Sequence, residues 1–276
     1  MTLKPSQIDA YLKRIGLSTA PPATIAGLHL LQDHHMRHVP FENLNVLLGR
    51  PIDLSPGALF DKIVMQGRGG YCFEVNTLFA ELLRATGFEP VPMMARVWLG
   101  DPVDVPPRTH ISHRVAIGGL DWVTDVGFGG RAARVPLRLE DAIPVEDGDG
   151  HVRIIRDPIF GYRVQREIDG VWTQQYSFHP ARAYPLDVSM GNHWTEHHES
   201  SKFRKSLGVG LFTEVGRRSF YGGVLRRRGE NFEPRNVRGL TQTLDVLETD
   251  FGLALTLTQA ERTRLAQFVE SDRAPR

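Results

Sequence analysis

Apolar side chains recur at steps of three and four residues in the first part of the chain, the spacing of one face of an α-helix. The pattern predicts a short helix over residues 6–15, a second helix that opens at Pro21 and Pro22, and a third over residues 72–87. The third stretch ends in a glycine, which is typical of a helix C-terminus. We therefore expect residues 1–90 to form a mainly helical first domain.

From this point onward the pattern changes to that of β-strands. Residues 91–99 predict one strand, and residues 108–130 and 162–178 each predict two strands joined by a tight turn. The turn residues are a Gly-Gly pair and an Asp-Gly pair, which favour the backbone twist of a β-hairpin. These strands indicate a β-barrel-like second domain over residues 91–205.

The last part of the chain mixes the two patterns. It carries strand patterns at residues 211–215 and 219–226 and two helical patterns, the second opening with a capping box between Thr258 and Glu261. We expect residues 206–276 to form a small α/β lid. The predicted fold class is therefore α+β, with helical, β-barrel-like and α/β parts in that order.

The composition excludes several classes of protein. The 276 residues are 41% hydrophobic, and their formal net charge is +1. Because positive and negative charges nearly cancel, the protein has no overall electrostatic field that would attract nucleic acid or a membrane surface. Neither a secretory apolar region nor a stretch of membrane-spanning length is evident. The chain has one cysteine, which excludes an intrachain disulfide, and we expect a cytoplasmic protein.

That cysteine, Cys72, stands at the start of the third predicted helix, after two glycines and a tyrosine. A helix N-terminus favours negative charge, so it favours the thiolate form of the side chain. The apolar stripe of the same helix includes Val75 and Phe79, which turns the sulfur toward the protein interior. An inert buried cysteine is the alternative, so the interpretation depends on which groups reach the sulfur.

The first predicted hairpin offers two such groups. With its turn at the Gly-Gly pair, Val115 faces Trp122, and His110 and Asp125 lie on one face as diagonal neighbours. Diagonal neighbours lie close enough for an imidazole and a carboxylate to meet. His113 points to the other face, so the register selects His110, although a β-bulge would change the parity.

A second pair of polar residues is expected to support the loop before Cys72. Glu42 stands between apolar residues, which predicts a buried carboxylate in need of a partner. Arg68 is the only cation of the loop RGGYCFE at residues 68–74. We expect these two side chains to form an ion pair that fixes the loop and takes no part in the chemistry.

A thiolate, an imidazole and a carboxylate form a nucleophilic triad when each lies within reach of the next. Backbone N–H groups of residues 70–73 would supply part of an oxyanion hole. The order cysteine, histidine, acid is that of papain-like enzymes, and it supports protease, transglutaminase, amidase and acyltransferase chemistry alike.

A metal site is the rival interpretation. His34 and His38, and separately His193 and His197, have the i, i+4 spacing of two ligands on one helix face. Neither pair lies in an HExxH motif, and no second cysteine is available. We therefore expect no metal.

Four motifs resemble those of the arylamine N-acetyltransferases. They are PFENL at residues 40–44, RGGYCFEVN at residues 68–76, Thr-His at residues 109–110 and DVGFGG at residues 125–130. Their order and spacing also agree, and the resemblance covers the whole chain. It implies a papain-like cysteine-enzyme architecture, with a helical domain, a β-barrel-like domain and an α/β lid. It also implies that Cys72, His110 and Asp125 form the triad.

The resemblance further implies a ping-pong reaction. An acetyl group would pass from acetyl-CoA through a Cys72 thioester to the nitrogen of a small-molecule arylamine or arylhydrazine. Acetyl-CoA would be a substrate, with no cofactor bound permanently. A cysteine amide synthase or hydrolase that uses another acyl donor on the same scaffold is the alternative.

Contacts with the donor are expected in two places. The resemblance points to Thr109, Phe128, Gly129 and Gly130, where the phenylalanine would form an apolar wall and the glycines would let backbone approach the donor. A simple turn explains the two glycines equally well. The arginine run at residues 226–228 would meet the phosphate groups of the donor or, alternatively, form a solvated face.

Overall fold

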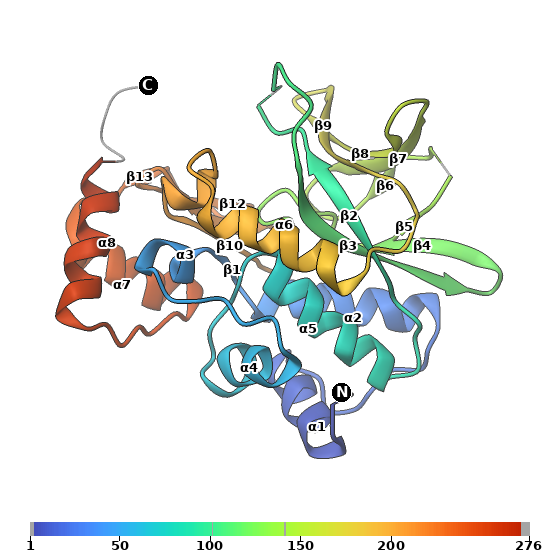
Figure 1. The fold of residues 1–276 in the computed structure, drawn as a ribbon, viewed down its shortest axis with the longest axis horizontal. Coiled ribbons are helices and arrows are strands. Elements are labelled where there is room, and N and C mark those ends of the chain that lie inside the picture. The colour runs from blue at the N-terminus through green and yellow to red at the C-terminus, as the bar shows by residue number, and fades with distance from the viewer. Residues whose placement is uncertain (1–2, 101, 141, 272–276) are drawn as a thin grey trace.

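The computed structural model describes residues 3–100, 102–140 and 142–271 (Figure 1). Its first part contains α1 (Pro5–Arg14), α2 (Ile25–His38), α3 (Leu44–Leu48), α4 (Pro56–Phe60), a π-helical turn (Asp61–Met65) and α5 (Cys72–Ala85). The three predicted helices are α1, α2 and α5, and they share one apolar cluster that includes Leu28 and Phe79. The second begins after the two prolines, because the Thr24 side chain caps it by accepting the Gly27 N–H at 3.2 Å.

An eight-stranded antiparallel sheet curls into the predicted barrel-like part. Its strands are β2 (Val91–Val97), β3 (Arg108–Ile117), β4 (Leu120–Thr124), β5 (Leu137–Arg138), β6 (Val145–Glu146), β7 (His151–Asp157), β8 (Gly161–Ile168) and β9 (Val171–Phe178). Their order across the sheet is β5-β4-β3-β2-β9-β8-β7-β6. Both predicted hairpins are present, and Val115 pairs with Trp122 as the pattern predicted.

A second sheet and two helices form the C-terminal part. The sheet runs β1 (Phe41–Glu42), β10 (Gly208–Phe212), β11 (Arg217–Tyr221), β12 (Val224–Arg228) and β13 (Arg235–Asn236), and α7 (Gly239–Phe251) and α8 (Gln259–Ser271) pack on it. The predicted capping box of α8 forms, because the Thr258 N–H donates to Glu261 at 2.8 Å and the Glu261 N–H donates back at 3.3 Å.

Two strand predictions in this part were wrong. The strand expected at residues 211–215 lies earlier, as β10. The strand expected at residues 219–226 is divided between β11 and β12, because Gly222 and Gly223 have φ values of 56° and 70° and form a hairpin turn.

Helix α6 (Pro185–His197) was not predicted from the polar, histidine-rich segment that forms it. Its apolar residues Leu186 and Met190 are 79% and 73% exposed, so they mark no buried stripe. The helix crosses in front of β3 in Figure 1 and contacts that strand.

The N-terminal part also contributes to the C-terminal sheet. Strand β1 pairs with β10 through Phe41 and Gly210, and Leu44 and Leu47 of α3 join the apolar cluster of α7 and α8. Packing therefore crosses the sequence boundary near residue 90, and the three-domain division stays a prediction. None of the helices in the described part of the chain combines the length and the apolar character that a membrane span requires.

Candidate active site

Cys72 is the first residue of α5 and is buried, with 3% of its surface exposed. The sulfur lies against β3, where it donates a hydrogen bond to the Thr109 carbonyl at 3.7 Å. Thr109 is the extra residue of a β-bulge, since Ala95 pairs with His110 and Arg96 pairs with Arg108. The bulge takes this carbonyl out of the regular ladder and leaves it available to the sulfur.

His110 and Asp125 meet as the hairpin register predicted. The imidazole Nε2 lies 2.6 Å from Asp125 Oδ2, and both side chains are buried. The ladder between β3 and β4 ends at the pair of His113 and Thr124, so Asp125 makes this contact from the loop just beyond the strand. The β-bulge lies on the far side of His110 and leaves its parity unchanged.

Charge interactions govern the titration of this pair. Burial by itself lowers the pKa of His110, but the Asp125 carboxylate and a hydrogen bond with Cys72 outweigh it and raise the pKa to about 10. For Asp125 the directions are reversed. Burial raises the pKa of this carboxyl, but His110 and the hydrogen bonds from Asn76 and the Gly127 N–H outweigh it and hold the pKa below its ordinary value. Because Nε2 faces the carboxylate, Nδ1 is the ring nitrogen left for the sulfur.

Asn76 supplies one of those further hydrogen bonds and joins three segments. Its Nδ2 donates to Asp125 Oδ1 and to the Ile111 carbonyl, each at 2.8 Å, and its Oδ1 accepts the Val126 N–H at 3.0 Å. Sequence reasoning did not assign this role. The signal was present, because Asn76 follows Cys72 by one helical turn on a face predicted to be buried, and a buried amide must be paired.

Gly127 permits this close packing. Its N–H donates to Asp125 Oδ1 at 2.8 Å. A Cβ at this position would lie 2.6 Å from the Asn76 amide nitrogen and 2.8 Å from the Cys72 Cα. Only glycine therefore allows the loop after β4 to approach the start of α5.

Two aromatic rings enclose the imidazole. Phe128 packs edge-on against His110 with ring centroids 5.1 Å apart, and Tyr176 of β9 lies at 5.0 Å. The two rings also contact each other at 4.9 Å. Burial and the adjacent Asp125 raise the pKa of Tyr176 well above its ordinary value. Phe128 thus forms part of an apolar wall beside the imidazole.

Four charged residues hold the loop before Cys72, three of them buried and Lys62 with 12% of its side chain exposed, and we call them the loop cluster: Glu42, Lys62, Arg68 and Glu74. Arg68 donates to Glu42 Oε1 from Nη2 at 2.6 Å and from Nε at 3.1 Å, which is the contact expected from the sequence. Lys62, from the π-helical turn, lies 2.6 Å from Glu74 and 3.7 Å from Glu42. Arg68 is therefore not the sole cation of this loop, because folding brings Lys62 into it.

The two carboxylates of the loop cluster have pKa values shifted in opposite directions. Burial raises the pKa of Glu42, but Lys62, Arg68 and the Leu44 N–H outweigh it and lower the pKa below its ordinary value. For Glu74, burial and the neighbouring Glu42 prevail over Lys62, so its pKa is raised. Glu74 Oε2 also accepts the Tyr71 N–H at 3.2 Å, which connects the residue before Cys72 to the first turn of α5.

Tyr71 connects the same loop to α6. Its hydroxyl donates to Asn192 Oδ1, and its ring packs edge-on against Phe203. Burial raises the pKa of Tyr71 well above its ordinary value, and the nearby Cys72 and Glu74 raise it further. Sequence reasoning assigned no role to Tyr71 or Asn192.

Of the four backbone N–H groups at residues 70–73 that were expected to contribute to an oxyanion hole, two already donate to other acceptors. The Gly70 N–H donates to the Pro40 carbonyl at 3.3 Å, and the Tyr71 N–H is taken by Glu74. Cys72 and Phe73 open α5, so their N–H groups have no acceptor within the helix. These two N–H groups are the ones available to a developing oxyanion.

Gly129 and Gly130 differ in what surrounds them. Gly129 has a φ of 77°, and a Cβ there would lie 3.2 Å from the Tyr221 hydroxyl and 3.5 Å from the Phe41 ring. It therefore serves both a turn and a close approach to the C-terminal sheet. A Cβ on Gly130 would meet nothing within 4 Å, so this residue borders open space.

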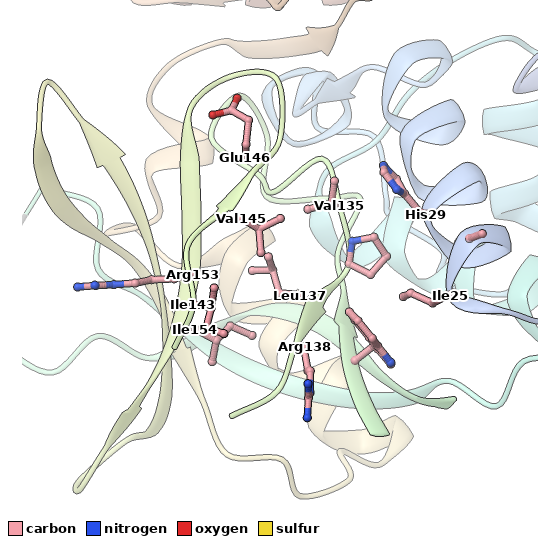
Figure 2. Close-up of a pocket in the computed structure, with 13 residues that line it drawn as sticks. Ile25, His29, Val135, Leu137, Arg138, Ile143, Val145, Glu146, Arg153 and Ile154 are labelled. Carbon is pink, nitrogen blue, oxygen red and sulfur yellow. The ribbon is translucent and has the colours of Figure 1, made fainter. Parts of the chain in front are cut away.

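A cavity of about 460 Å³ lies elsewhere (Figure 2). Ile25 and His29 of α2 face Leu137, Val145 and Ile154 of the barrel strands across it. None of the site residues named above lines it. Within the described residues, no three His, Cys, Asp or Glu side chains are grouped so that they could hold a metal ion.

Comparisons with known proteins agree with this geometry. A family described as N-acetyltransferase matches residues 24–260. The arylamine N-acetyltransferase / N-hydroxyarylamine O-acetyltransferase of Salmonella typhimurium is 33% identical over 256 residues, which cover 91% of this chain and 90% of that protein. The solved Salmonella typhimurium arylamine N-acetyltransferase has a TM-score of 0.90 at 31% identity and covers 98% of this chain and 100% of that one. Mycobacterium marinum arylamine N-acetyltransferase in complex with CoA has a TM-score of 0.88 at 28% identity, with 95% and 99% covered.

Proposed function

Because this chain belongs to the arylamine N-acetyltransferase family, we propose that Cys72, His110 and Asp125 are the triad that performs its reaction. The protein is an acyltransferase that moves an acetyl group from acetyl-CoA to the nitrogen of an arylamine. The hydrolase and amide synthase alternative is set aside, since the relatives over most of the chain are named for acetyl transfer.

The first half-reaction forms the acetyl-enzyme. The Cys72 thiolate attacks the carbonyl carbon of acetyl-CoA, and the N–H groups of Cys72 and Phe73 bind the oxyanion. The tetrahedral intermediate collapses by breaking the bond to the CoA sulfur. The CoA thiolate leaves with the proton that His110 holds, and Cys72 carries the acetyl group as a thioester.

The second half-reaction regenerates the thiolate. The amine nitrogen attacks the Cys72 thioester while His110 accepts its proton, and the sulfur leaves as the acetamide forms. Acetylation removes the interaction with the sulfur that helps to raise the pKa of His110, so the imidazole becomes a better match for a base at neutral pH. Arylamines and arylhydrazines suit this step because their nitrogens are largely unprotonated there.

One observation carries the proposal: the imidazole of His110 lies between the sulfur and a carboxylate 2.6 Å away, all three buried. Asp125 fixes the tautomer and holds Nδ1 toward the sulfur. The apolar walls of Phe128 and Tyr176 keep water from the acetyl-enzyme.

The supporting roles are also part of the proposal. Glu42 and Arg68 hold the nucleophile loop in place, and Thr109, Phe128, Gly129 and Gly130 line the approach of the donor. The proposed location is the cytoplasm, where a reducing environment keeps the Cys72 thiol free.

Intact-protein mass spectrometry tests the central step. Incubation with acetyl-CoA and no amine should add one acetyl group, and an aniline added afterwards should remove it. The Cys72→Ser variant should remain unlabelled. A wild-type protein that gains no acetyl group from acetyl-CoA would refute the proposed mechanism.

A further inference from the structure

The cavity of Figure 2 lies between two apolar cores of the protein. Ile25 of α2 and Trp122 of β4 pack against the helical cluster that includes Leu28. Leu137 and Ile154 belong to the apolar cluster of the barrel instead. The space left between these side chains is about 460 Å³. Small-molecule sites occupy roughly 300–1,000 Å³, so the cavity has the size of a ligand site.

The wall of this cavity is mainly apolar. Nine of its 13 lining residues have apolar side chains, and they come from α2, from β4 and from residues 135–154. Two of them, Ile143 and Val145, leave 60% and 38% of their surface exposed. A molecule in the cavity would remove apolar surface of this kind from water, and such burial is the main source of affinity for an apolar ligand.

The charged lining residues give the cavity no excess of either sign. Arg153 extends away from it in Figure 2, donates to Gln165 at 2.8 Å and stacks on Trp172 with its guanidinium carbon 4.0 Å from the ring centroid. Arg138 and Glu146 carry opposite charges and lie at opposite ends of the cavity in Figure 2. An ion would lose hydration in this wall without gaining a partner of opposite charge at its centre, so the wall favours an uncharged ligand.

His29 supplies a polar group on the side of α2. It faces Leu137 and Val145 across the cavity in Figure 2. One ring nitrogen of a neutral imidazole donates a hydrogen bond and the other accepts one. A ligand that carries a single polar group could therefore direct that group to His29 and its apolar part to the barrel.

Buried hydrogen bonds fix α2 against the barrel one helical turn beyond His29. Gln32 is 1% exposed. Its Nε2 donates to the Ala133 carbonyl at 2.8 Å, and its Oε1 accepts the Thr124 hydroxyl at 2.6 Å. These contacts set the distance between α2 and the barrel at this end of the cavity. The space is therefore formed before a ligand enters, and binding need not separate the helix from the sheet.

We propose that this cavity binds an uncharged aromatic molecule of one or two rings, with a hydrogen-bonding group directed to His29. Ile25 and Leu137 would contact the two sides of the ligand, since they face each other across the cavity. The site is distinct from the candidate active site, because neither Cys72 nor His110 lines it. It does not depend on the proposed function.

The test compares two probes of nearly equal shape, benzamide and benzoate, by ligand-observed NMR titration. Cys72 is first alkylated with N-phenylmaleimide, which occupies the candidate active site and reacts at the single cysteine of the chain. Benzamide should bind the alkylated protein with a Kd of roughly 1 mM or lower, as is common for a ligand of this size. Benzoate should bind at least about tenfold more weakly, because its charge would be desolvated against an apolar wall.

Two matched variants locate the bound probe. Val145→Trp fills the cavity from β6 and should weaken benzamide binding at least about tenfold, because the indole takes the space of the ligand. Val171→Trp makes the same substitution on β9, at a residue that is 64% exposed and does not line the cavity, and it should leave the Kd unchanged. Thermal unfolding checks that both variants fold. Val145→Asp places a charge in the same wall, should also weaken binding, and replaces Val145→Trp if the larger side chain prevents folding.

Three results would overturn the proposal. If benzamide does not bind the alkylated protein, the cavity is not a ligand site of this class. Equal affinity of Val145→Trp and Val171→Trp would place the bound probe elsewhere on the protein. Benzoate that binds as tightly as benzamide would contradict the preference for an uncharged ligand.

Discussion

Two buried polar clusters reach the start of α5 from different parts of the fold. The loop cluster of Glu42, Lys62, Arg68 and Glu74 lies on the side of the helical part and β1. On the barrel side, Asn76 connects the helix to the pair of His110 and Asp125. Both clusters are almost closed to solvent, so burial alone does not separate a structural cluster from a chemical one.

The difference lies in what each cluster does with its protons. The loop cluster sets two carboxylates against two fixed cations and directs their hydrogen bonds to the backbone of Leu44 and Tyr71. The barrel cluster contains an imidazole that can exchange a proton with a sulfur. The first should therefore govern stability and the second the rate of acetyl transfer.

The largest expected effect comes from Asp125→Asn. The amide would keep its oxygen toward the donors of Asn76 and Gly127 and turn its NH₂ toward His110 Nε2. Nδ1 would then carry the ring proton and could not accept one from Cys72. We expect kcat/KM for acetyl transfer to fall roughly 10³- to 10⁴-fold.

Thermal unfolding serves as the control for this variant, because a lost proton acceptor differs from a lost fold. The midpoint should stay within a few degrees of the wild type. A rate within tenfold of the wild type would remove Asp125 from the triad.

Breaking the loop cluster should instead lower stability. Arg68→Gln removes the nearer of the two cations that neutralise the buried Glu42 and leaves only Lys62 at 3.7 Å. This loss should reduce the free energy of unfolding by roughly 3–5 kcal/mol. Chemical denaturation gives this quantity. The kcat of the folded fraction, measured at low temperature, should fall much less than in Asp125→Asn.

Arg50→Gln offers a matched comparison, because Arg50 also makes a two-pronged pair, with Glu261, but is 33% exposed. Its loss should cost about 0–1 kcal/mol. If Arg68→Gln costs no more than this, the loop cluster is not a source of stability.

The smallest expected effect is on the pH dependence of stability, to which His110 and His113 contribute in opposite directions. His113 lies on the face of β3 opposite to His110. Burial lowers the pKa of His113 to about 3, whereas that of His110 is raised to about 10. The lowered pKa gives stability that is present above the unfolded value near 6.5 and is lost as pH falls toward 3. The raised pKa gives stability that is present below 6.5 and is lost as pH rises toward 10.

Replacing His113 should therefore flatten only the acid side of the stability profile. In wild-type protein, this group should account for about 2 kcal/mol of stability lost between pH 7 and pH 5. Denaturation of His113→Phe at both pH values should show that difference reduced, and His197→Gln, which removes an exposed histidine, should not change it. An unaltered acid slope in His113→Phe would contradict the assignment.

Local pattern predicted much of the site. The apolar spacing after Cys72 specified a helix that begins at the sulfur, and the Gly-Gly turn specified which histidine faces Asp125. Both inferences depend on contacts only a few residues apart, where helix and hairpin geometry leave few alternatives. Strand boundaries after residue 205 were predicted less well, because Gly222 and Gly223 interrupt one apolar run with a turn.

The sequence by itself therefore determined that Cys72 begins a helix, that His110 and not His113 meets Asp125, and that Glu42 needs a partner. Only the tertiary structure decided that Lys62 joins the loop cluster, that Asn76 connects α5 to Asp125, and that β1 belongs to the C-terminal sheet. The hydrogen bonds from Arg166 of the barrel and Arg217 of the C-terminal sheet to the carbonyls of Arg131 and Gly130 are of the same kind, since they join three parts of the chain. These contacts join segments far apart along the chain, and their geometry is fixed by how whole sheets and helices pack, which no local spacing records.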